Sequence, residues 1–443
     1  MDAEAARRYG FATKAGSTPL RIARTEGVWL YTDDGQQILD ASGGAIVMNI
    51  GHGRREVAEA YAREAERAAY VLPPFATESR VRLVDRLIGS WLPRGLTRIA
   101  FTSGGSESVD AALRVARAHF FAKGETKRWK VIGRDLSYHG TTLATLAVGG
   151  HEKRRAAFEP WLADLPKAPA CYCFRCPLGK TYPSCAVACA DEVEAAILRA
   201  GPETVAAVIA EPIGGSTAGA LVPPDEYWPK LAAICKRHGV LLIADEVMTG
   251  FGRTGKRMAV DHFGITPDML IGGKGLTGGY APMGGIFASE AVVAPIAERG
   301  QEVMFFTYSA HPASCAAADK VLEILEREHL VERAALMGER LGKRLARLLE
   351  HPNVGDVRGR GLLWAVELVA DKATKTPFPI AAGLTAKVVA AGIANGIFVY
   401  PGGVDPARDV ITLGPPFTIS ESEIELIGER LERAIVSAVA RVA

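Results

Sequence analysis

Lys274 is a lysine whose neighbours could change its chemistry. It follows the short apolar run 269–271, stands between two glycines, and comes after Asp245 in the chain. An ammonium at the end of a buried strand loses hydration, which lowers its pKa and leaves a neutral amine that attacks aldehydes. A lysine in a glycine loop could equally lie in solvent, so other residues must decide. The chemistry predicted for Lys274 is a Schiff base with the aldehyde of pyridoxal 5′-phosphate.

Such a cofactor needs a site for its phosphate, and the segment 101–108, Phe-Thr-Ser-Gly-Gly-Ser-Glu-Ser, offers one. We expect this segment to leave a strand and enter a helix. The backbone N–H groups of Gly105 and Ser106, with the Ser106 hydroxyl, would then meet a dianion at the positive end of the helix. Serine also caps helices that bind nothing, so the motif alone leaves both interpretations open.

Asp245 is the residue expected to hold the nitrogen of the cofactor's ring. It follows the predicted strand 240–244, and ligands of open α/β sheets bind at the carboxyl ends of the strands. A carboxylate bonded to this nitrogen keeps it protonated, so the ring can withdraw electrons. Asp245 and Glu246 could instead hold Mg²⁺, although the chain has no Gly-x-x-x-x-Gly-Lys-Ser/Thr loop.

Two further segments after predicted strands bear on the ring. Tyr138 would stack on one face of the ring and Val247 would cover the other, although a Tyr-His pair can also serve packing alone.

The segment 250–255, Gly-Phe-Gly-Arg-Thr-Gly, matches the dinucleotide fingerprint. Five residues separate it from its strand and no helical period follows, so a nicotinamide dehydrogenase is disfavoured.

Apolar strand-like runs alternate with helical periods along the chain. This alternation predicts an α/β fold with a mostly parallel central sheet covered by helices on both faces. The 443 residues are too many for one simple core. We expect a segment 1–51 that joins the small domain, a large cofactor-binding domain over 52–320, and a small α+β domain over 321–443. Ser420 and Glu423 form a capping box that should begin a terminal helix.

The charges are balanced, with 52 Lys and Arg against 50 Asp and Glu, and they are scattered. Neither nucleic acid nor an anionic membrane is therefore an expected partner. No apolar run approaches the length that spans a bilayer, and the first residues lack a signal-peptide pattern. We expect a cytoplasmic protein whose ligand is a small molecule.

Five of the seven cysteines lie between Cys171 and Cys189. Cys173/Cys176 and Cys185/Cys189 could supply four thiolates to a structural zinc, although the second pair is one residue wider than Cys-x-x-Cys. A disulfide is an alternative, and reduced thiols in a packed insertion are what a cytoplasmic chain favours. No metal is expected in the catalytic site.

Together these motifs make the chain resemble the class III aminotransferases, which are pyridoxal phosphate enzymes of fold type I, the aspartate-aminotransferase-like fold. The resemblance covers nearly the full length. The matching segments, in chain order, are Gly51-His-Gly, Phe101-Thr-Ser-Gly-Gly-Ser-Glu, Tyr138-His-Gly, Glu211-Pro-Ile, Ala244-Asp-Glu-Val, Gly250-Phe-Gly-Arg-Thr-Gly, Gly273-Lys-Gly, Thr307-Tyr-Ser-Ala-His-Pro, Arg358-Gly-Arg-Gly-Leu and Pro415-Pro-Phe.

The resemblance implies a role for each matching residue. Lys274 would form the Schiff base, Asp245 would bind the pyridinium, and Gly105 with Ser106 would bind the phosphate. Tyr138 and Val247 would enclose the ring, and Glu211 would support the site. Thr307 would reach the phosphate of the neighbouring subunit's cofactor, which implies a homodimer with active sites at the subunit interface.

The departures from the family concern the substrate. Ornithine- and 4-aminobutyrate-type members carry Gln-Gly-Glu after Glu-Pro-Ile, where this chain has 214–216, Gly-Gly-Ser. Met248 stands where those members often have a glutamine, and Ile46 is near a tryptophan of several amine:pyruvate transaminases. The arginine that grips a carboxylate in the latter enzymes is replaced by Asp405. We expect Arg408 on the same loop to substitute for it, the alternative being a solvated loop charge.

The function predicted is a transaminase that moves an amino group from a primary amine or ω-amino acid to a keto acid such as pyruvate, by a ping-pong mechanism. A class III racemase, aminomutase or lyase could use the same cofactor site. A non-catalytic protein that binds the cofactor is disfavoured by the intact Lys274 and Asp245.

Overall fold

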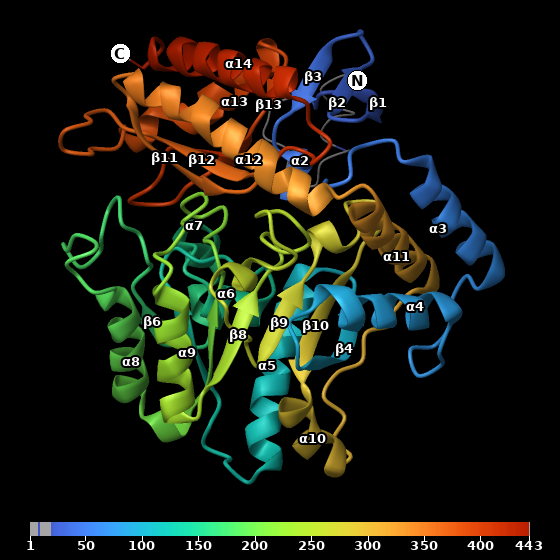
Figure 1. The fold of residues 1–443 in the computed structure, drawn as a ribbon. Coiled ribbons are helices and arrows are strands. Elements are labelled where there is room, and N and C mark those ends of the chain that lie inside the picture. Colours follow the sequence, from blue (N-terminus) through green and yellow to red (C-terminus); the bar gives the residue numbers. More distant parts are fainter. Residues whose placement is uncertain (1–7, 9–18, 443) are drawn as a thin grey trace.

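The computed structural model describes Arg8 and residues 19–442. The rest of the predicted N-terminal segment, 1–7 and 9–18, and residue 443 of the predicted small domain lie outside the described residues. Figure 1 shows a lower body built on a large sheet and an upper body with smaller sheets and long helices. Among the described residues, no helix combines the length and apolar character needed to cross a membrane.

The large sheet has seven strands in the order β4-β10-β9-β8-β7-β5-β6. Only β10 runs antiparallel to its neighbours, so the predicted mostly parallel sheet is confirmed. The bounds are β4 Leu96–Thr102, β10 Gly284–Ser289, β9 Met269–Gly272, β8 Leu241–Asp245, β7 Val205–Ala210, β5 Lys130–Arg134 and β6 Lys167–Ala168.

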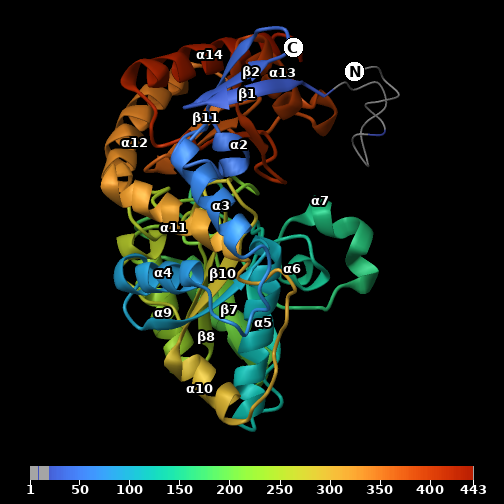
Figure 2. The same ribbon diagram turned by 90° about the vertical axis from the view of Figure 1, so that its right-hand side faces the viewer.

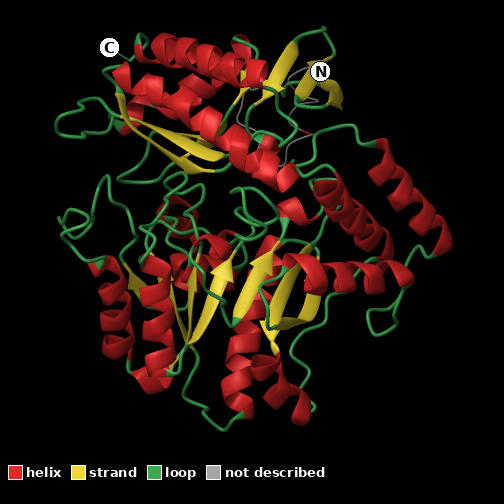
Figure 3. Cartoon of the chain, viewed as in Figure 1, coloured by secondary structure: helices red, strands yellow, loops and turns green. Residues whose placement is uncertain are grey.

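Helices cover both faces of this sheet, as Figure 3 shows in red against yellow. In β7, Ala207 and Ile209 pack in the apolar cluster of α5 (Gly105–Ala122), whereas Val208 and Ala210 pack in the cluster of α9 (Tyr227–His238). Successive residues of a strand point to opposite faces, so a strand buried on both faces is continuously apolar. This explains why the central strands were readable from the sequence. The other helices of this body are α6 Leu143–Val148, α7 Glu152–Arg155, α8 Ala188–Ala200 and α10 Glu290–Glu298.

The upper body contains two four-stranded sheets. One is antiparallel and consists of β11 Val354–Arg360, β12 Leu363–Leu368, β15 Val410–Leu413 and β14 Tyr400–Gly402. The other joins β1 Ile22–Glu26, β2 Trp29–Thr32 and β3 Gln37–Asp40 to β13 Ile397–Phe398. Residues 22–40 therefore lie with the C-terminal part of the chain (Figure 2). The helices are α12 Leu330–Ala346, α13 Leu384–Ala394 and α14 Glu421–Val439, and the predicted capping box of Ser420 and Glu423 is confirmed.

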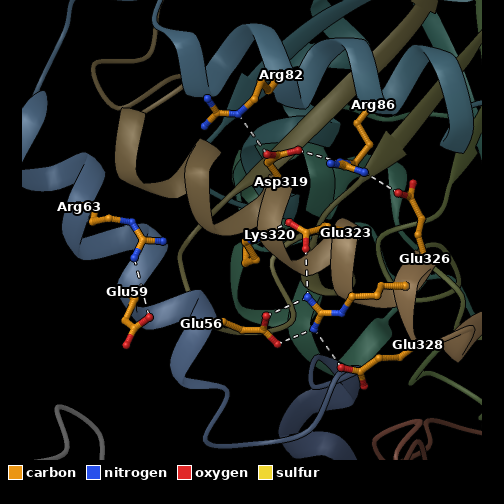
Figure 4. Close-up of polar contacts among 11 residues, drawn as sticks. Glu56, Glu59, Arg63, Arg82, Arg86, Asp319, Lys320, Glu323, Glu326 and Glu328 are labelled. Atoms are coloured by element: carbon orange, nitrogen blue, oxygen red, sulfur yellow. Dashed lines mark hydrogen bonds and ion pairs between the residues drawn. The ribbon is translucent and has the colours of Figure 1, made fainter.

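Three helices form one side of the molecule where the two bodies meet, namely α3 Arg55–Arg67, α4 Glu78–Arg86 and α11 Pro312–Arg327. Figure 4 shows the ion pairs that join them. Asp319 of α11 accepts from Arg86 Nε at 2.7 Å and from Arg82 Nε at 3.4 Å. These pairs join α11 to α4.

Shorter elements complete the chain. They are α2 Gly43–Ile46, whose interior has non-helical dihedral angles, the π-helical turn Leu87–Trp91, and the 3₁₀ turns Ala156–Trp161, Pro202–Thr204, Ala259–His262, Lys274–Leu276, Arg347–Glu350 and Ile380–Ala382.

Candidate active site

One cavity of about 190 Å³ lies at the carboxyl ends of the parallel strands. Seven of the residues predicted from the sequence line it, and they are Gly105, Ser106, Tyr138, Glu211, Asp245, Val247 and Lys274. The other lining residues are His139, Gly140, Ile213, Gly215, Ser216 and Met248. The position agrees with the general rule that open α/β sheets bind ligands at this edge.

Lys274 begins a short 3₁₀ turn directly after β9 and Gly273, with a φ of 39°. Non-glycine residues adopt this left-handed conformation rarely, and it is one of the strained conformations found at active sites. Its surroundings remove most of its hydration, and this lowers its pKa to about 8. The nearby carboxylates of Asp245 and Glu211 oppose the shift. Roughly a tenth of the amine is therefore neutral at pH 7.

Asp245 is the last residue of β8 and is buried. Its Oδ2 lies 2.7 Å from His139 Nδ1, and its Oδ1 accepts from the backbone N–H of Val247 at 3.1 Å. These two contacts fix the orientation of the carboxylate. His139 Nε2 is buried and has no hydrogen-bond partner among the described residues. A buried carboxylate held in this way can bind a protonated ring nitrogen.

Gly105 is the first residue of α5, at the end of the loop after β4. A Cβ atom on Gly105 would lie 2.9 Å from Val247 Cγ1, and one on Gly140 would lie 2.6 Å from Ser106 Oγ. Both glycines therefore permit close approaches that a larger residue would block. Ser106 Oγ also accepts from the N–H of Thr141 at 3.2 Å. This helix N-terminus has the free N–H groups and positive charge that bind phosphates.

Glu211 follows β7 and connects several parts of the cavity wall. Its Oε1 accepts from the N–H groups of Gly215 at 3.2 Å and Tyr138 at 3.4 Å. Its Oε2 lies 3.6 Å from Arg134 Nη2 but has no hydrogen-bond partner among the described residues. Burial raises the pKa of Glu211, and the charges of His139 and Arg134 oppose this.

Two predicted residues lie outside this cavity. Thr307 is exposed in the loop before α11 and is not among the residues that line the cavity. Arg408 lies between β14 and β15, with its Nε 2.9 Å from Asp405 Oδ1. It is not among the residues that line the cavity. Its predicted role toward a substrate carboxylate stays a prediction.

The alternatives raised by the sequence can be compared with the geometry. Glu246 points away from Asp245, because its carboxylate accepts from the Val260 N–H at 2.8 Å and from the Thr249 hydroxyl. Within the described ranges, no group of three or more His, Cys, Asp or Glu residues is arranged to hold a metal ion.

The glycine-rich segment 250–255 joins the two bodies of the molecule. Its Arg253 is buried and donates to the carbonyls of Met48 at 2.9 Å, Leu362 at 3.1 Å and Pro415 at 2.7 Å. These acceptors belong to the N-terminal part of the chain and to the upper body. The segment thus has a structural role that its resemblance to a dinucleotide motif does not indicate.

Sequence reasoning did not assign roles to several residues of this site. His139 as the partner of Asp245 and Arg134 as the partner of Glu211 were both missed. Arg154 was also missed, although its guanidinium lies 4.4 Å from the centroid of the Tyr138 ring. The Tyr-His-Gly motif gave a signal for His139, but the pairing depends on the order of β5, β7 and β8 in the sheet.

The fold and the site together define a protein that can hold a pyridine aldehyde between a lysine and a carboxylate. The family model for class III aminotransferases matches residues 11–435, and the chain belongs to this family. Class III aminotransferases use pyridoxal phosphate. The residues fit this cofactor, since a lysine of lowered pKa, an oriented carboxylate and a glycine-lined helix N-terminus face one cavity.

Several known proteins are similar to this chain over nearly their whole length. An uncharacterized aminotransferase of Schizosaccharomyces pombe is 38% identical over 98% of this chain and 96% of that protein. A putrescine–pyruvate aminotransferase of Pseudomonas aeruginosa is 34% identical over 91% of this chain and 88% of that protein. An (S)-enantioselective omega-transaminase from Thermomicrobium roseum has a TM-score of 0.90 and 39% identity, covering 100% of this chain and 95% of that one.

Proposed function

We propose that this aminotransferase is an ω-type transaminase, which moves an amino group from a primary amine or ω-amino acid to pyruvate or a similar keto acid. The observation that carries the proposal is Lys274, with its lowered pKa, in the same cavity as the oriented carboxylate of Asp245. Similarity to proteins described as a putrescine–pyruvate aminotransferase and an omega-transaminase supports the choice of substrate class.

The wall of the cavity also supports an amine donor without an α-carboxylate. Ile213 and Met248 contribute apolar surface, and Ser216 contributes a small polar one. No arginine or second lysine is among the described residues that line the cavity. A donor whose reacting end carries no carboxylate needs no such cation.

In the mechanism we propose, pyridoxal phosphate supplies the electron sink that makes the hydrogen next to the amino group acidic. Lys274 would hold the cofactor and, as a neutral amine, would take that proton from the substrate. Asp245 keeps the ring nitrogen protonated, and His139 fixes the Asp245 carboxylate. Gly105 and Ser106 bind the phosphate.

The walls around the ring have complementary roles in this proposal. Tyr138 and Val247 enclose the ring and exclude water from its faces. Glu211 supports the wall by accepting from the N–H groups of Tyr138 and Gly215. Exclusion of water strengthens the interaction between Asp245 and the cationic ring, because the surrounding dielectric is low.

The active assembly in this proposal is a homodimer in which Thr307 reaches the partner's cofactor phosphate. Thr307 is exposed between the exposed aromatic side chains of Phe305 and Tyr308. The Tyr308 ring contacts that of Tyr70, which is also exposed, with centroids 6.5 Å apart. Light scattering on the purified protein tests this assembly. Thr307→Ala should weaken cofactor binding without changing the mass of the assembly in solution.

A half-reaction distinguishes a transaminase from a racemase, aminomutase or lyase. A transaminase given an amine alone should convert its cofactor to the amino form and release one equivalent of carbonyl product, then return to the starting spectrum with pyruvate. A screen of amines, ω-amino acids and α-amino acids identifies the donor. Turnover of amine with no amino form of the cofactor would contradict the proposal.

Arg408 is proposed to bind the carboxylate of the acceptor. In the single chain its guanidinium lies beside Asp405. Arg408→Ala should raise KM for pyruvate and leave the rate with an uncharged amine unchanged. An unchanged KM for pyruvate would remove the role. The cytoplasmic location stays a prediction from the sequence.

A further inference from the structure

The segment between β6 and α8, together with the first turn of α8, contains five cysteines. Their side chains line one small cavity of about 20 Å³, which is separate from the active site. They are Cys171, Cys173, Cys176, Cys185 and Cys189, and all are free thiols. Cysteines that are distant in the sequence thus converge at one place in the fold.

Three of these thiols interact with one another. The Cys171 thiol is buried and shares hydrogen bonds with Cys173 and Cys189. The hydrogen bond from Cys171 lowers the pKa of Cys173 to about 7, and a second one lowers the pKa of Cys189. The pKa of Cys171 is raised, because it donates these bonds and is buried. Cys173 is also the exposed member of the five.

These properties matter together because the thiolate is the nucleophile in thiol chemistry. A cysteine of pKa about 7 is roughly half ionised at pH 7, whereas one of ordinary pKa is ionised to roughly 3%. Cys173 therefore combines ionisation, exposure and a second thiol within hydrogen-bonding distance. Cys315, which is buried elsewhere with its pKa raised to about 12, has none of these features.

The residues between the cysteines contact the upper body. Tyr172 and Arg175 both donate to the Glu367 carboxylate of β12, Arg175 Nε at 2.7 Å. The Phe174 carbonyl accepts from Lys375 Nζ at 2.7 Å. In Figure 1 this loop rises from α8 toward the strands of the upper body. Covalent change at the cysteines would therefore act on a segment that joins the two bodies.

We propose that Cys171, Cys173 and Cys189 form a thiol–disulfide exchange site, in which Cys173 reacts first with low-molecular-weight disulfides. The Cys173 thiolate attacks one sulfur of the small disulfide, whose S–S bond breaks and releases one half as a thiolate. Cys171 then loses its proton to solvent and attacks the Cys173 sulfur, which releases the other half. The protein loses two electrons and two protons, and the small disulfide becomes two thiols.

Cys189 gives the oxidised site a second arrangement. Its thiolate can attack Cys171 in the newly formed bond and return Cys173 to the ionised form. The resulting Cys171–Cys189 bond would close a longer loop than a bond between neighbours two residues apart. In both arrangements Cys171 is the shared member of the disulfide, because it is the sulfur in contact with the other two.

The test uses the full-length reduced protein and oxidised glutathione as the probe. Trypsin cleaves after Lys167, Arg175, Lys180 and Arg199, so Cys171 and Cys173 fall in one peptide, Cys176 in a second, and Cys185 with Cys189 in a third. We expect either the first peptide with two hydrogens lost or a crosslink between the first and third peptides. Mass spectrometry without reduction distinguishes these products.

Matched variants assign the reacting sulfur. Cys173→Ser should lower the rate of exchange at pH 7 about tenfold or more, because the ionised thiol is lost. Cys176→Ser removes a thiol from the same cavity and should leave the rate unchanged. As a measurement that needs no variant, alkylation of the Cys173 peptide in the wild-type protein should reach half its maximal rate near pH 7.

Two outcomes would overturn the proposal. One is a crosslink between the second and third peptides alone, or no disulfide at all. The other is a stoichiometric zinc ion in the purified protein, released when the cysteines are modified, since thiolates bound to zinc would be a metal site. Circular dichroism of each variant excludes loss of the fold as the cause of a lower rate.

Discussion

Two regions of this molecule carry many charges, and they arrange them differently. In the ion-pair region of α3, α4 and α11, every charged side chain drawn in Figure 4 has at least one opposite charge beside it. In the active-site cavity, Glu211 Oε2 and His139 Nε2 are buried without hydrogen-bond partners among the described residues. Charges are therefore paired in both regions, since Glu211 lies beside Arg134 and His139 beside Asp245. Of the two regions, only the cavity also leaves buried polar atoms without a hydrogen-bond partner among the described residues.

Exposure to solvent is a second difference between the two regions. Arg63 and Glu59 lie 3.8 Å apart with most of the arginine exposed, and exposed pairs of this kind contribute little. The cavity is shielded, so each charge there acts strongly on the pKa of its neighbours. Variants in the cavity should therefore change activity greatly. Variants in the ion-pair region should change both activity and stability very little.

The largest effect is expected for Lys274→Ala. Loss of a positioned proton-transfer group lowers rates by about a hundred- to ten-thousand-fold, and the variant also loses its covalent hold on the cofactor. The measurement is the half-reaction with the best amine from the screen. Lys256→Ala is the control, because Lys256 is exposed and outside the cavity. A variant that retains near-normal turnover would contradict the role of Lys274.

A smaller effect is expected when the charge of Asp245 is removed and its shape is kept. The rate at which apoenzyme captures pyridoxal phosphate should rise with pH through about 8, since the pKa of Lys274 is lowered to about 8 and only the neutral amine reacts. The Asp245 carboxylate opposes this lowering. Asp245→Asn should therefore move the rise to lower pH while it lowers the rate of the half-reaction. A rise that stays at the same pH would argue against the coupling.

The third effect in size is expected for Gly140→Ala. The added Cβ would lie 2.6 Å from Ser106 Oγ, and the φ of Gly140 is 136°. We expect cofactor affinity to weaken by about 5- to 150-fold, because overpacking costs about 1–3 kcal/mol. Gly89→Ala is the control, since a Cβ there meets nothing within 4 Å. Titration with pyridoxal phosphate measures the change, and equal affinities in the two variants would exclude the proposed cradle.

The smallest effect is expected in the ion-pair region, for Arg63→Ala. Glu59 is its one ion-pair partner among the described residues and its side chain is mostly exposed, so we expect Tm to change by less than about 2 °C. Activity should be unchanged. A larger loss of stability would show that this region acts as a cooperative network, and the contrast with the cavity would then need revision.

Much of the fold was predictable because the central strands are buried on both faces. Their continuous apolar runs, such as 205–210 and 241–244, report burial directly in the sequence. The Ser420–Glu423 capping box was predictable for a similar reason, because its partners are three residues apart. The pairing of β13 with β3 was not predictable in this way, since it joins segments more than 350 residues apart.

By itself, the sequence determined the family, the Schiff-base lysine candidate at 274 and the carboxylate at 245, because short motifs and local periodicity are written within a few residues. Only the tertiary structure decided that His139 faces Asp245, that Arg134 lies beside Glu211, and that five of the cysteines share one cavity. The physical reason is that such contacts depend on strand order and on how loops pack. Those long-range choices leave little trace in any single stretch of the chain.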